Sequence, residues 1–238
     1  MTASAKRTEP MEMPVPKAGR IKVWDAPVRL FHWALMALIG VAWWTGEQHM
    51  LEWHRLAGYL IATLLLFRII WGVVGSGTAR FASFIHGPRA LLAHWRAGRA
   101  GGVVVARPGH NPFGGWSVVT MLFLLVIQVV LGMFAVDIDG MESGPFSWLV
   151  EFDTGRLAAR CHGVVFNILL AFIALHIAAI AYYQFYRRNN LVGAMITGSK
   201  AWSGERPTLR FAPGWLAVAI MLACGGLFWF LIAWWGRA

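Results

Sequence analysis

Cysteine is nearly absent from this chain of 238 residues, which has only Cys161 and Cys224. There is no Cys-x-x-Cys and no Cys-x-x-Cys-His motif, so the sequence excludes a disulfide scaffold, a thiolate-bound zinc or iron–sulfur site, and covalent c-type haem. We interpret the two cysteines as small buried residues. Any metal or cofactor is therefore expected to be held by histidine, of which the chain has 8.

Charged residues are also scarce. They make up 13% of the chain, about half the share in a typical soluble protein, whereas 58% of the residues are hydrophobic. Five apolar runs explain this composition, each close to the roughly 20 residues that cross a bilayer. A soluble all-helical core is the alternative, but five nearly uncharged runs would leave too little polar surface to cover it. We therefore predict an all-α fold, an integral membrane helix bundle. The predicted spans are Leu30–Thr45, His54–Val74, Trp116–Val136, His162–Phe185 and Pro213–Trp235.

The formal net charge is +10, which in a soluble protein would suggest a nucleic-acid partner. The basic residues, however, gather in segments 1–29, 75–115 and 186–212, while the opposite segments are mainly acidic. Cytoplasmic loops of membrane proteins retain Lys and Arg. The pattern therefore predicts a membrane protein with its N-terminus on the cytoplasmic side and its C-terminus on the outer side, and no nucleic acid is needed to explain the charge. Residues 1–20 lack the apolar core of a signal peptide and are interpreted as a disordered cytoplasmic tail.

Four histidines lie within or at the ends of the apolar runs, where ionisable residues are costly and are candidates for function. His162 and His176 share the fourth run, and at about 100° per residue they project from nearly the same face, roughly 21 Å apart along the axis. His54 falls at the depth of His162, and His32 at the depth of His176. A lone histidine on an apolar helix is more often a packing residue, but two pairs at matched depths favour axial ligation of two iron porphyrins.

Three arginines are expected to accompany these pairs. Arg68 follows His54 by the same interval of 14 residues and so lies near the inner pair, where an unpaired guanidinium is unfavourable. A haem propionate or a quinone head group would pair with it, and snorkelling or bonding to carbonyls is the alternative. Arg55 and Arg160 border the outer pair and could neutralise outer propionates.

Other residues near the predicted ligands carry weaker signals. Glycines would let a flat macrocycle approach the helices, although in membrane helices glycine also serves helix packing. The remaining histidines lie in loops or near span ends and are interpreted as solvated or structural. The glycines near the predicted ligands are Gly40, Gly58, Gly72, Gly132 and Gly163. The histidines that are not predicted ligands are His49, His86, His94 and His110.

Several motifs together resemble a known family, the bacterial di-haem cytochrome b561 group, which includes the b-type subunit of membrane-bound nickel–iron hydrogenases. The resemblance covers about Ile21 to Trp202 and implies a location in the bacterial inner membrane, with the C-terminus in the periplasm. It implies a four-helix unit with two b haems, axial ligands His32, His54, His162 and His176, and electron exchange with a membrane quinone pool and an extracytoplasmic redox partner. The motifs are Trp24–Trp33 (WDAPVRLFHW), His54–Tyr59 (HRLAGY), Phe67–Arg68, Gly109–Pro112 (GHNP), and His162–Gly163 with His176.

These observations predict residues 21–202 as a di-haem four-helix domain and residues 203–238 as an additional C-terminal transmembrane helix. That fifth helix has no ligand histidine, and three roles stay open for it: docking a partner, shielding a haem edge, or packing. We expect electrons to pass between an outer partner, two haems b and quinone. The partner would be a c-type cytochrome, a hydrogenase or another dehydrogenase, and the acidic outer loop Asp137–Asp153 either steers a basic partner or is simply solvated.

Two other functions stay open at this stage. One is direct oxidation of a small donor such as superoxide, with Arg55, Arg156 and Arg160 attracting the anion and quinone accepting the electrons. The other is a haem-free membrane anchor or transporter in which the histidines are structural. A visible haem spectrum would separate the second from the di-haem hypothesis.

Overall fold

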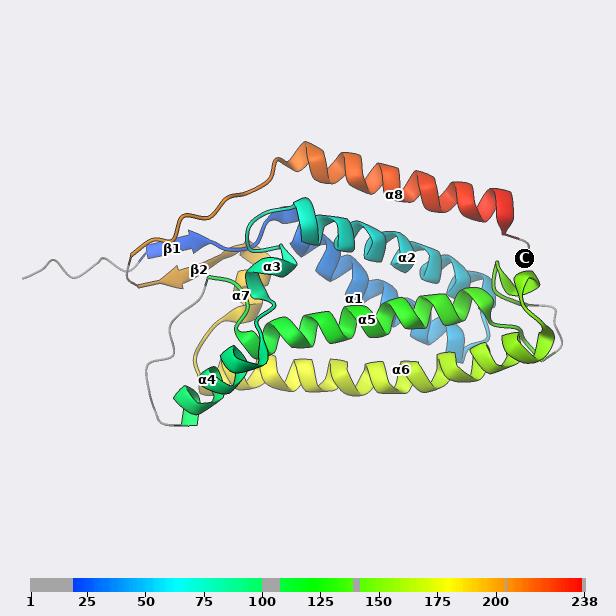
Figure 1. Cartoon of the computed structure of the whole chain (residues 1–238), viewed down its shortest axis with the longest axis horizontal. Coiled ribbons are helices and arrows are strands. Elements are labelled where there is room, and N and C mark those ends of the chain that lie inside the picture. Colours follow the sequence, from blue (N-terminus) through cyan, green and yellow to red (C-terminus); the bar gives the residue numbers. More distant parts are fainter. Residues whose placement is uncertain (1–18, 100–107, 139–141, 204, 237–238) are drawn as a thin grey trace, which may run out of the picture.

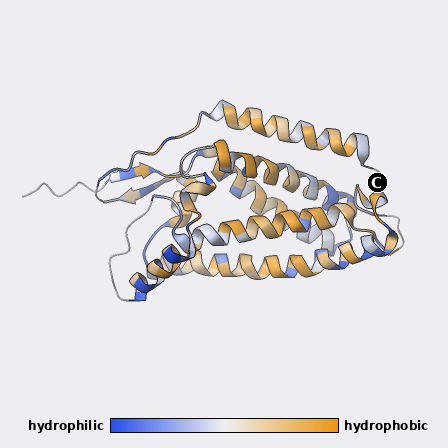
Figure 2. Ribbon diagram, in the orientation of Figure 1, coloured by the Kyte–Doolittle hydropathy of each residue, from blue (hydrophilic) through white to orange (hydrophobic). Residues whose placement is uncertain are grey.

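A computed structural model describes residues 19–99, 108–138, 142–203 and 205–236. Within these residues, five helices are long and apolar enough to cross a membrane. They lie side by side, and apolar residues cover their length (Figures 1 and 2). Many large apolar side chains point outward, as lipid-facing side chains do, and this confirms the predicted all-α membrane bundle. The five helices are α1 (Ala26–Glu47), α2 (Leu51–Val74), α5 (Pro112–Phe134), α6 (Phe152–Ala181) and α8 (Gly214–Trp235).

Four of these helices begin earlier than the hydropathy of the sequence predicts, and in α1 and α5 a polar side chain caps the first turn. The Asp25 carboxylate accepts a hydrogen bond of 2.9 Å from the Val28 amide, so α1 begins at Ala26. The Asn111 side chain accepts one of 2.6 Å from the Gly114 amide and starts α5 at Pro112. Helix α6 begins at Phe152, ten residues before the predicted start at His162. The predicted start is late because the first turns of α6 contain charged residues, which lower the local hydropathy.

The bundle consists of two antiparallel helix pairs. Helix α1 packs on α2, α5 packs on α6, and the two pairs meet through α2 and α5. Helix α8 lies along α2 on the side away from α6 (Figure 1), and its Cys224 is buried in the contact. Cys161, in contrast, is only partly buried, so the prediction of a buried residue is wrong there.

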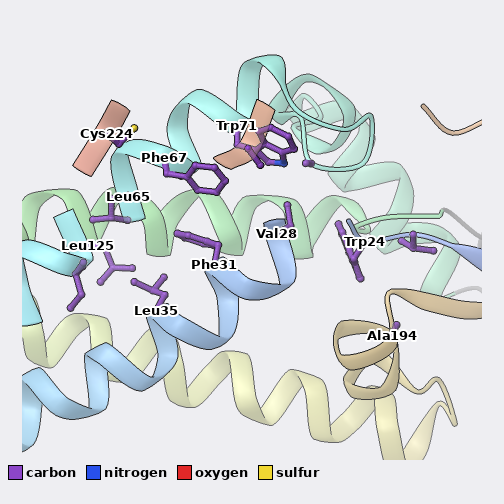
Figure 3. Close-up of a cluster of buried hydrophobic side chains, with 14 of the residues drawn as sticks. Trp24, Val28, Phe31, Leu35, Leu65, Phe67, Trp71, Leu125, Ala194 and Cys224 are labelled. Carbon is purple, nitrogen blue, oxygen red and sulfur yellow. The ribbon is translucent and has the colours of Figure 1, made fainter. Parts of the chain in front are cut away.

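Apolar side chains from several helices form one buried cluster between α1, α2 and their neighbours (Figure 3). Phe31 and Leu35 of α1 meet Leu65, Phe67 and Trp71 of α2 in this cluster. The Phe67 and Trp71 rings stack with their centroids 5.8 Å apart. The cluster therefore fixes α1 against α2 and sets where the side chains of these helices point.

Short elements form a cap at one end of the bundle, and this cap contains much of the described part of the basic segments (Figures 1 and 2). Strand β1 (Gly19–Lys22) pairs antiparallel with β2 (Ser199–Trp202), a pairing that the sequence analysis did not predict. Gly19 and Arg20 thus belong to a strand, whereas the rest of the predicted tail lies outside the described residues. The other parts of this end are α3 (Phe81–Phe84), α4 (Pro88–Arg99), α7 (Leu191–Thr197) and the π-helix η2 (Tyr182–Tyr186), which continues α6. At the opposite end, the α5–α6 connection contains the 3₁₀ turn η1 (Ser147–Leu149).

The cap joins the beginning and the end of the four-helix unit. The amide of Val23 donates to the Gly198 carbonyl at 2.7 Å, directly beside the strand pair. Gly198 itself has a φ of +79°, the left-handed conformation that ends α7 and favours glycine. The Thr78 hydroxyl donates to the Val23 carbonyl, which ties the α2–α3 connection to the same point.

Candidate functional site

The two outer histidines meet between α2 and α6. His54 lies in the first turn of α2, and its ring centroid is 6.0 Å from that of His162 on α6. Their ring planes are inclined by 73°. The structure therefore brings together the first of the two pairs predicted from depth and spacing.

Each outer imidazole is held by a backbone carbonyl of the neighbouring helix. The His54 Nδ1 lies 2.8 Å from the Ala42 carbonyl oxygen of α1, and the His162 Nδ1 lies 2.9 Å from the Gln128 carbonyl oxygen of α5. A carbonyl oxygen can only accept, so each Nδ1 carries the proton. Each Nε2 then keeps its lone pair for a metal, which is the usual arrangement of histidine ligands.

The outer pair fits an iron porphyrin. A bond from a metal to an imidazole nitrogen is about 2 Å long, so two opposed imidazoles on one ion have ring centres roughly 6 Å apart. No group of three His, Cys, Asp or Glu side chains forms a metal site in the described part of the chain. A metal between His54 and His162 would therefore need further ligands from outside these side chains, and the four nitrogens of a porphyrin would supply them. Helices α2 and α6 are not among the closely packed helix pairs, which is compatible with a group between them.

The inner histidines are arranged differently. His32 on α1 and His176 on α6 lie within electrostatic range of each other, but the described residues show no ring contact between them like that of the outer pair. The His32 Nδ1 is enclosed and has no hydrogen-bond partner. The inner histidines are thus close enough to interact electrostatically, and the His32 Nδ1 lacks the carbonyl partner that orients each outer ring.

A third histidine, His110, joins the inner region. Its ring lies 4.7 Å from that of Trp24 and 4.8 Å from that of Phe84, and its Nδ1 is enclosed without a partner. Burial, and next the charge of Arg68 and of the inner histidines, lowers the pKa of His110 to about 3, so its ring is neutral at physiological pH. The sequence predicts that His110 is solvated or structural, and the structure excludes a solvated ring nitrogen at Nδ1. Its position next to the helix cap Asn111 was the available signal.

Arg68 is buried beside these histidines. It is 3% exposed, and its guanidinium carbon lies 4.9 Å from the centre of the Phe81 ring. Its Nη1 has no hydrogen-bond partner, and no salt bridge to it occurs among the described residues. Asp25 lies within electrostatic range, but its carboxylate already accepts from Val28 and from the Trp71 indole at 3.0 Å. Arg68 is therefore a buried cation that an anionic group such as a propionate would satisfy.

The outer arginines are more exposed. The Arg55 Nη1 is 3.4 Å from the Ser143 carbonyl oxygen, whereas Arg160 is exposed on α6. Arg156 donates to the Val136 carbonyl at 2.9 Å and lies 4.0 Å from the Asp137 carboxylate. Arg156 is thus already engaged with protein groups, and no observation favours a small-anion site made by these three arginines.

The predicted glycines divide into three groups. Gly72 gives room to the Phe81 side chain, so a macrocycle does not explain it. Gly132 lies against the His162 ring. A Cβ atom added at Gly40, Gly58 or Gly163 would meet no protein atom within 4 Å, which leaves those positions free for lipid or a cofactor.

Comparison with known proteins agrees with the motifs. Residues 23–198 match the family described as prokaryotic cytochrome b561. The "Probable Ni/Fe-hydrogenase B-type cytochrome subunit" of Azotobacter chroococcum mcd 1 is 24% identical over 224 residues, which cover 81% of this chain and 93% of that protein. The protein of the same name from Bradyrhizobium diazoefficiens is 25% identical over 213 residues, 76% of this chain and 85% of that protein. No solved structure matches the chain.

Proposed function

The chain belongs to the prokaryotic cytochrome b561 family, and from this premise we propose that it is a di-haem b-type cytochrome that exchanges electrons between an extracytoplasmic redox protein and membrane quinone. The family makes it a haem-containing, multi-pass membrane protein of electron transport. The observation that supports the proposal best is the outer histidine pair, with ring centroids 6.0 Å apart and both Nδ1 atoms bonded to carbonyls.

We assign one haem b to His54 and His162 and a second to His32 and His176. Residues 21–202 then form the di-haem unit, and α8 is an additional helix that packs on α2. Bound haem supplies reversible one-electron redox chemistry. Held by two imidazoles, each haem would favour electron transfer over oxygen binding.

The arginines are assigned to the charges of the cofactors. Arg68 is buried with a free Nη1, so we place it opposite an inner propionate or a quinone head group. Arg55 and Arg160 border the outer pair and would balance the outer propionates. The partly buried Arg55 is expected to act more strongly than the exposed Arg160, because solvent screens an exposed charge.

The quinone is assigned to the inner end of the bundle. His32, His110 and Arg68 all contain enclosed polar atoms without partners there. Buried polar groups are normally hydrogen-bonded, so a ligand with polar oxygens and an apolar ring suits this region. The aromatic rings of Trp24 and Phe84 beside His110 supply the apolar contact.

The redox partner is assigned to the opposite end. The relatives are named as subunits of Ni/Fe-hydrogenase, so a hydrogenase is the first candidate, and a c-type cytochrome or another dehydrogenase is the alternative. Glu142, Glu151 and Asp153 are exposed at that end, where they would attract a basic surface. The basic cap at the other end favours a cytoplasmic N-terminus and a periplasmic C-terminus.

Visible spectra of the purified protein test this function. We expect a Soret band and a sharp α band after reduction by dithionite, two haems b per chain, and reoxidation of the reduced haems by an added quinone. Protein without haem would support the anchor or transporter alternative. One haem per chain would refute the assignment of two sites, and haems that quinone cannot reoxidise would refute quinone as the acceptor.

A further inference from the structure

The two outer histidines are seated by the same local arrangement on different helices. His54 bonds to the carbonyl of Ala42, and Gly46 follows four residues later on α1. His162 bonds to the carbonyl of Gln128, and Gly132 follows four residues later on α5. The carbonyl and the glycine thus have the same spacing in both cases, although α1 and α5 have different sequences.

Helix geometry explains why the residue at this spacing matters. In an α-helix the carbonyl of residue i accepts the amide of residue i+4. Each Cα–Cβ bond tilts toward the helix N-terminus, so the side chain at i+4 covers the turn that contains this carbonyl. Without a side chain at i+4, a group from another helix can reach the carbonyl and share it.

The distances show that a side chain at either position would crowd the imidazole ring. A Cβ atom at Gly132 would lie 2.9 Å from Cε1 and 3.2 Å from Nδ1 of His162. A Cβ atom at Gly46 would lie 3.1 Å from Nδ1 of His54. Carbon atoms in van der Waals contact are about 3.5–4.0 Å apart, so either methyl group would push the ring away from its carbonyl, more strongly at Gly132.

We infer that Gly46 and Gly132 are positioning residues for the outer haem. They expose the carbonyls of Ala42 and Gln128 to the imidazole Nδ1 protons, and so direct each Nε2 toward the iron. This inference rests on the proposed function, because it concerns the ligands of that haem. A hydrogen bond from Nδ1 makes the imidazole a more basic ligand, which stabilises the oxidised iron and lowers the reduction potential of the haem.

The arrangement distinguishes this role from ordinary helix packing. A glycine that only lets two helices approach would face the backbone of the other helix. Gly46 and Gly132 instead face imidazole rings. The His32 Nδ1 has no hydrogen-bond partner, so the inner pair does not share this arrangement.

Alanine substitutions test the inference in the full-length purified protein. We expect Gly132→Ala to move the reduction equilibrium of the outer haem toward the reduced form by threefold to tenfold, where tenfold equals 59 mV for one electron. Gly46→Ala should move the same equilibrium toward the reduced form by a smaller factor. Both should change the electron paramagnetic resonance signal of the oxidised outer haem, which reports ligand orientation, and leave the inner haem unchanged.

Gly226→Ala is the matched control, because Gly226 lies in α8, which has no histidine, and an added Cβ there meets no atom within 4 Å. If Gly46→Ala and Gly132→Ala both behave like Gly226→Ala in potential and resonance signal, the inference is wrong. Loss of the outer haem alone in Gly132→Ala supports it. If Gly132→Ala does not fold, the milder Gly46→Ala decides. Failure of the proposed function has a separate signature, which is the absence of two haems from the unsubstituted protein.

Discussion

The outer and inner histidine pairs have different surroundings. At the outer pair, both rings face each other and the backbone satisfies both Nδ1 atoms. At the inner pair, the Nδ1 of His32 is enclosed without a partner, and unpartnered atoms of Arg68 and His110 lie in the same region. Backbone carbonyls thus satisfy both Nδ1 atoms of the outer site, whereas the inner site contains polar atoms that a ligand could hydrogen-bond.

This difference suggests that the two sites have different functions. A pre-oriented ligand pair loses little freedom when it binds a metal, so the outer site is built to hold one cofactor in one orientation. Buried, unpaired polar groups are costly and usually mark a function. The inner site is therefore the better candidate for contact with a second molecule, which we propose to be quinone.

The largest expected effects come from removing one ligand of either pair. His54→Ala or His162→Ala should leave one haem per chain, because a single imidazole and the remaining contacts do not hold the outer haem. His32→Ala or His176→Ala should likewise remove the inner haem only. Haem content per chain and potentiometric titration of the visible bands measure both outcomes. Two fully bound bis-histidine haems in His54→Ala would show that the pairs are wrongly assigned.

Arg68 offers a smaller but more selective change at the inner site. The buried positive charge of Arg68 stabilises the reduced form of the inner haem. Arg68→Leu removes this charge, so the reduction potential of the inner haem should fall. With an effective dielectric constant of about 20, the free energy of reduction of the inner haem should become less favourable by roughly 1–2 kcal/mol. The outer potential should stay unchanged, and Arg68→Lys should restore part of the shift. Equal shifts of both haems in a redox titration would place Arg68 outside the inner site.

The exposed arginine at the outer site should have the smallest effect. Arg160→Gln is expected to lower the outer reduction potential by less than about 1 kcal/mol, because solvent screens exposed charges. The shift should shrink further at high salt. Titrations at low and high ionic strength measure it, with Arg68→Leu as the buried counterpart. A large shift that does not depend on salt would mean that Arg160 is buried against the cofactor.

The sequence alone predicts much of the fold and the encounter of His54 with His162. Five apolar runs predict the five spans, and the 14-residue interval between His162 and His176 predicts two levels of histidines. Such features depend only on composition and helix geometry, which are local properties. The starts of α1 and α5 differ from the predicted ones because Asp25 and Asn111 are polar, and hydropathy averages treat polar caps as the ends of a span.

Features that depend on contacts between distant residues could not be predicted. The pairing of β1 with β2 joins two four-residue polar segments far apart in the sequence, and neither has a strong strand pattern. The enclosure of His110 depends on Trp24 and Phe84, which come from two other segments. The carbonyl partners of the outer histidines are backbone atoms, so no residue type in the sequence indicates them.

The pairing of β1 with β2 also sets an order of events during synthesis. The ribosome makes β1 before any membrane helix, and β2 only after α6 and α7. Until β2 has left the ribosome, β1 lacks the partner that it has in the finished structure. His32 follows β1 by ten residues and His176 precedes β2 by 23. This part of the cap is therefore completed only after the first four membrane-spanning helices have been made.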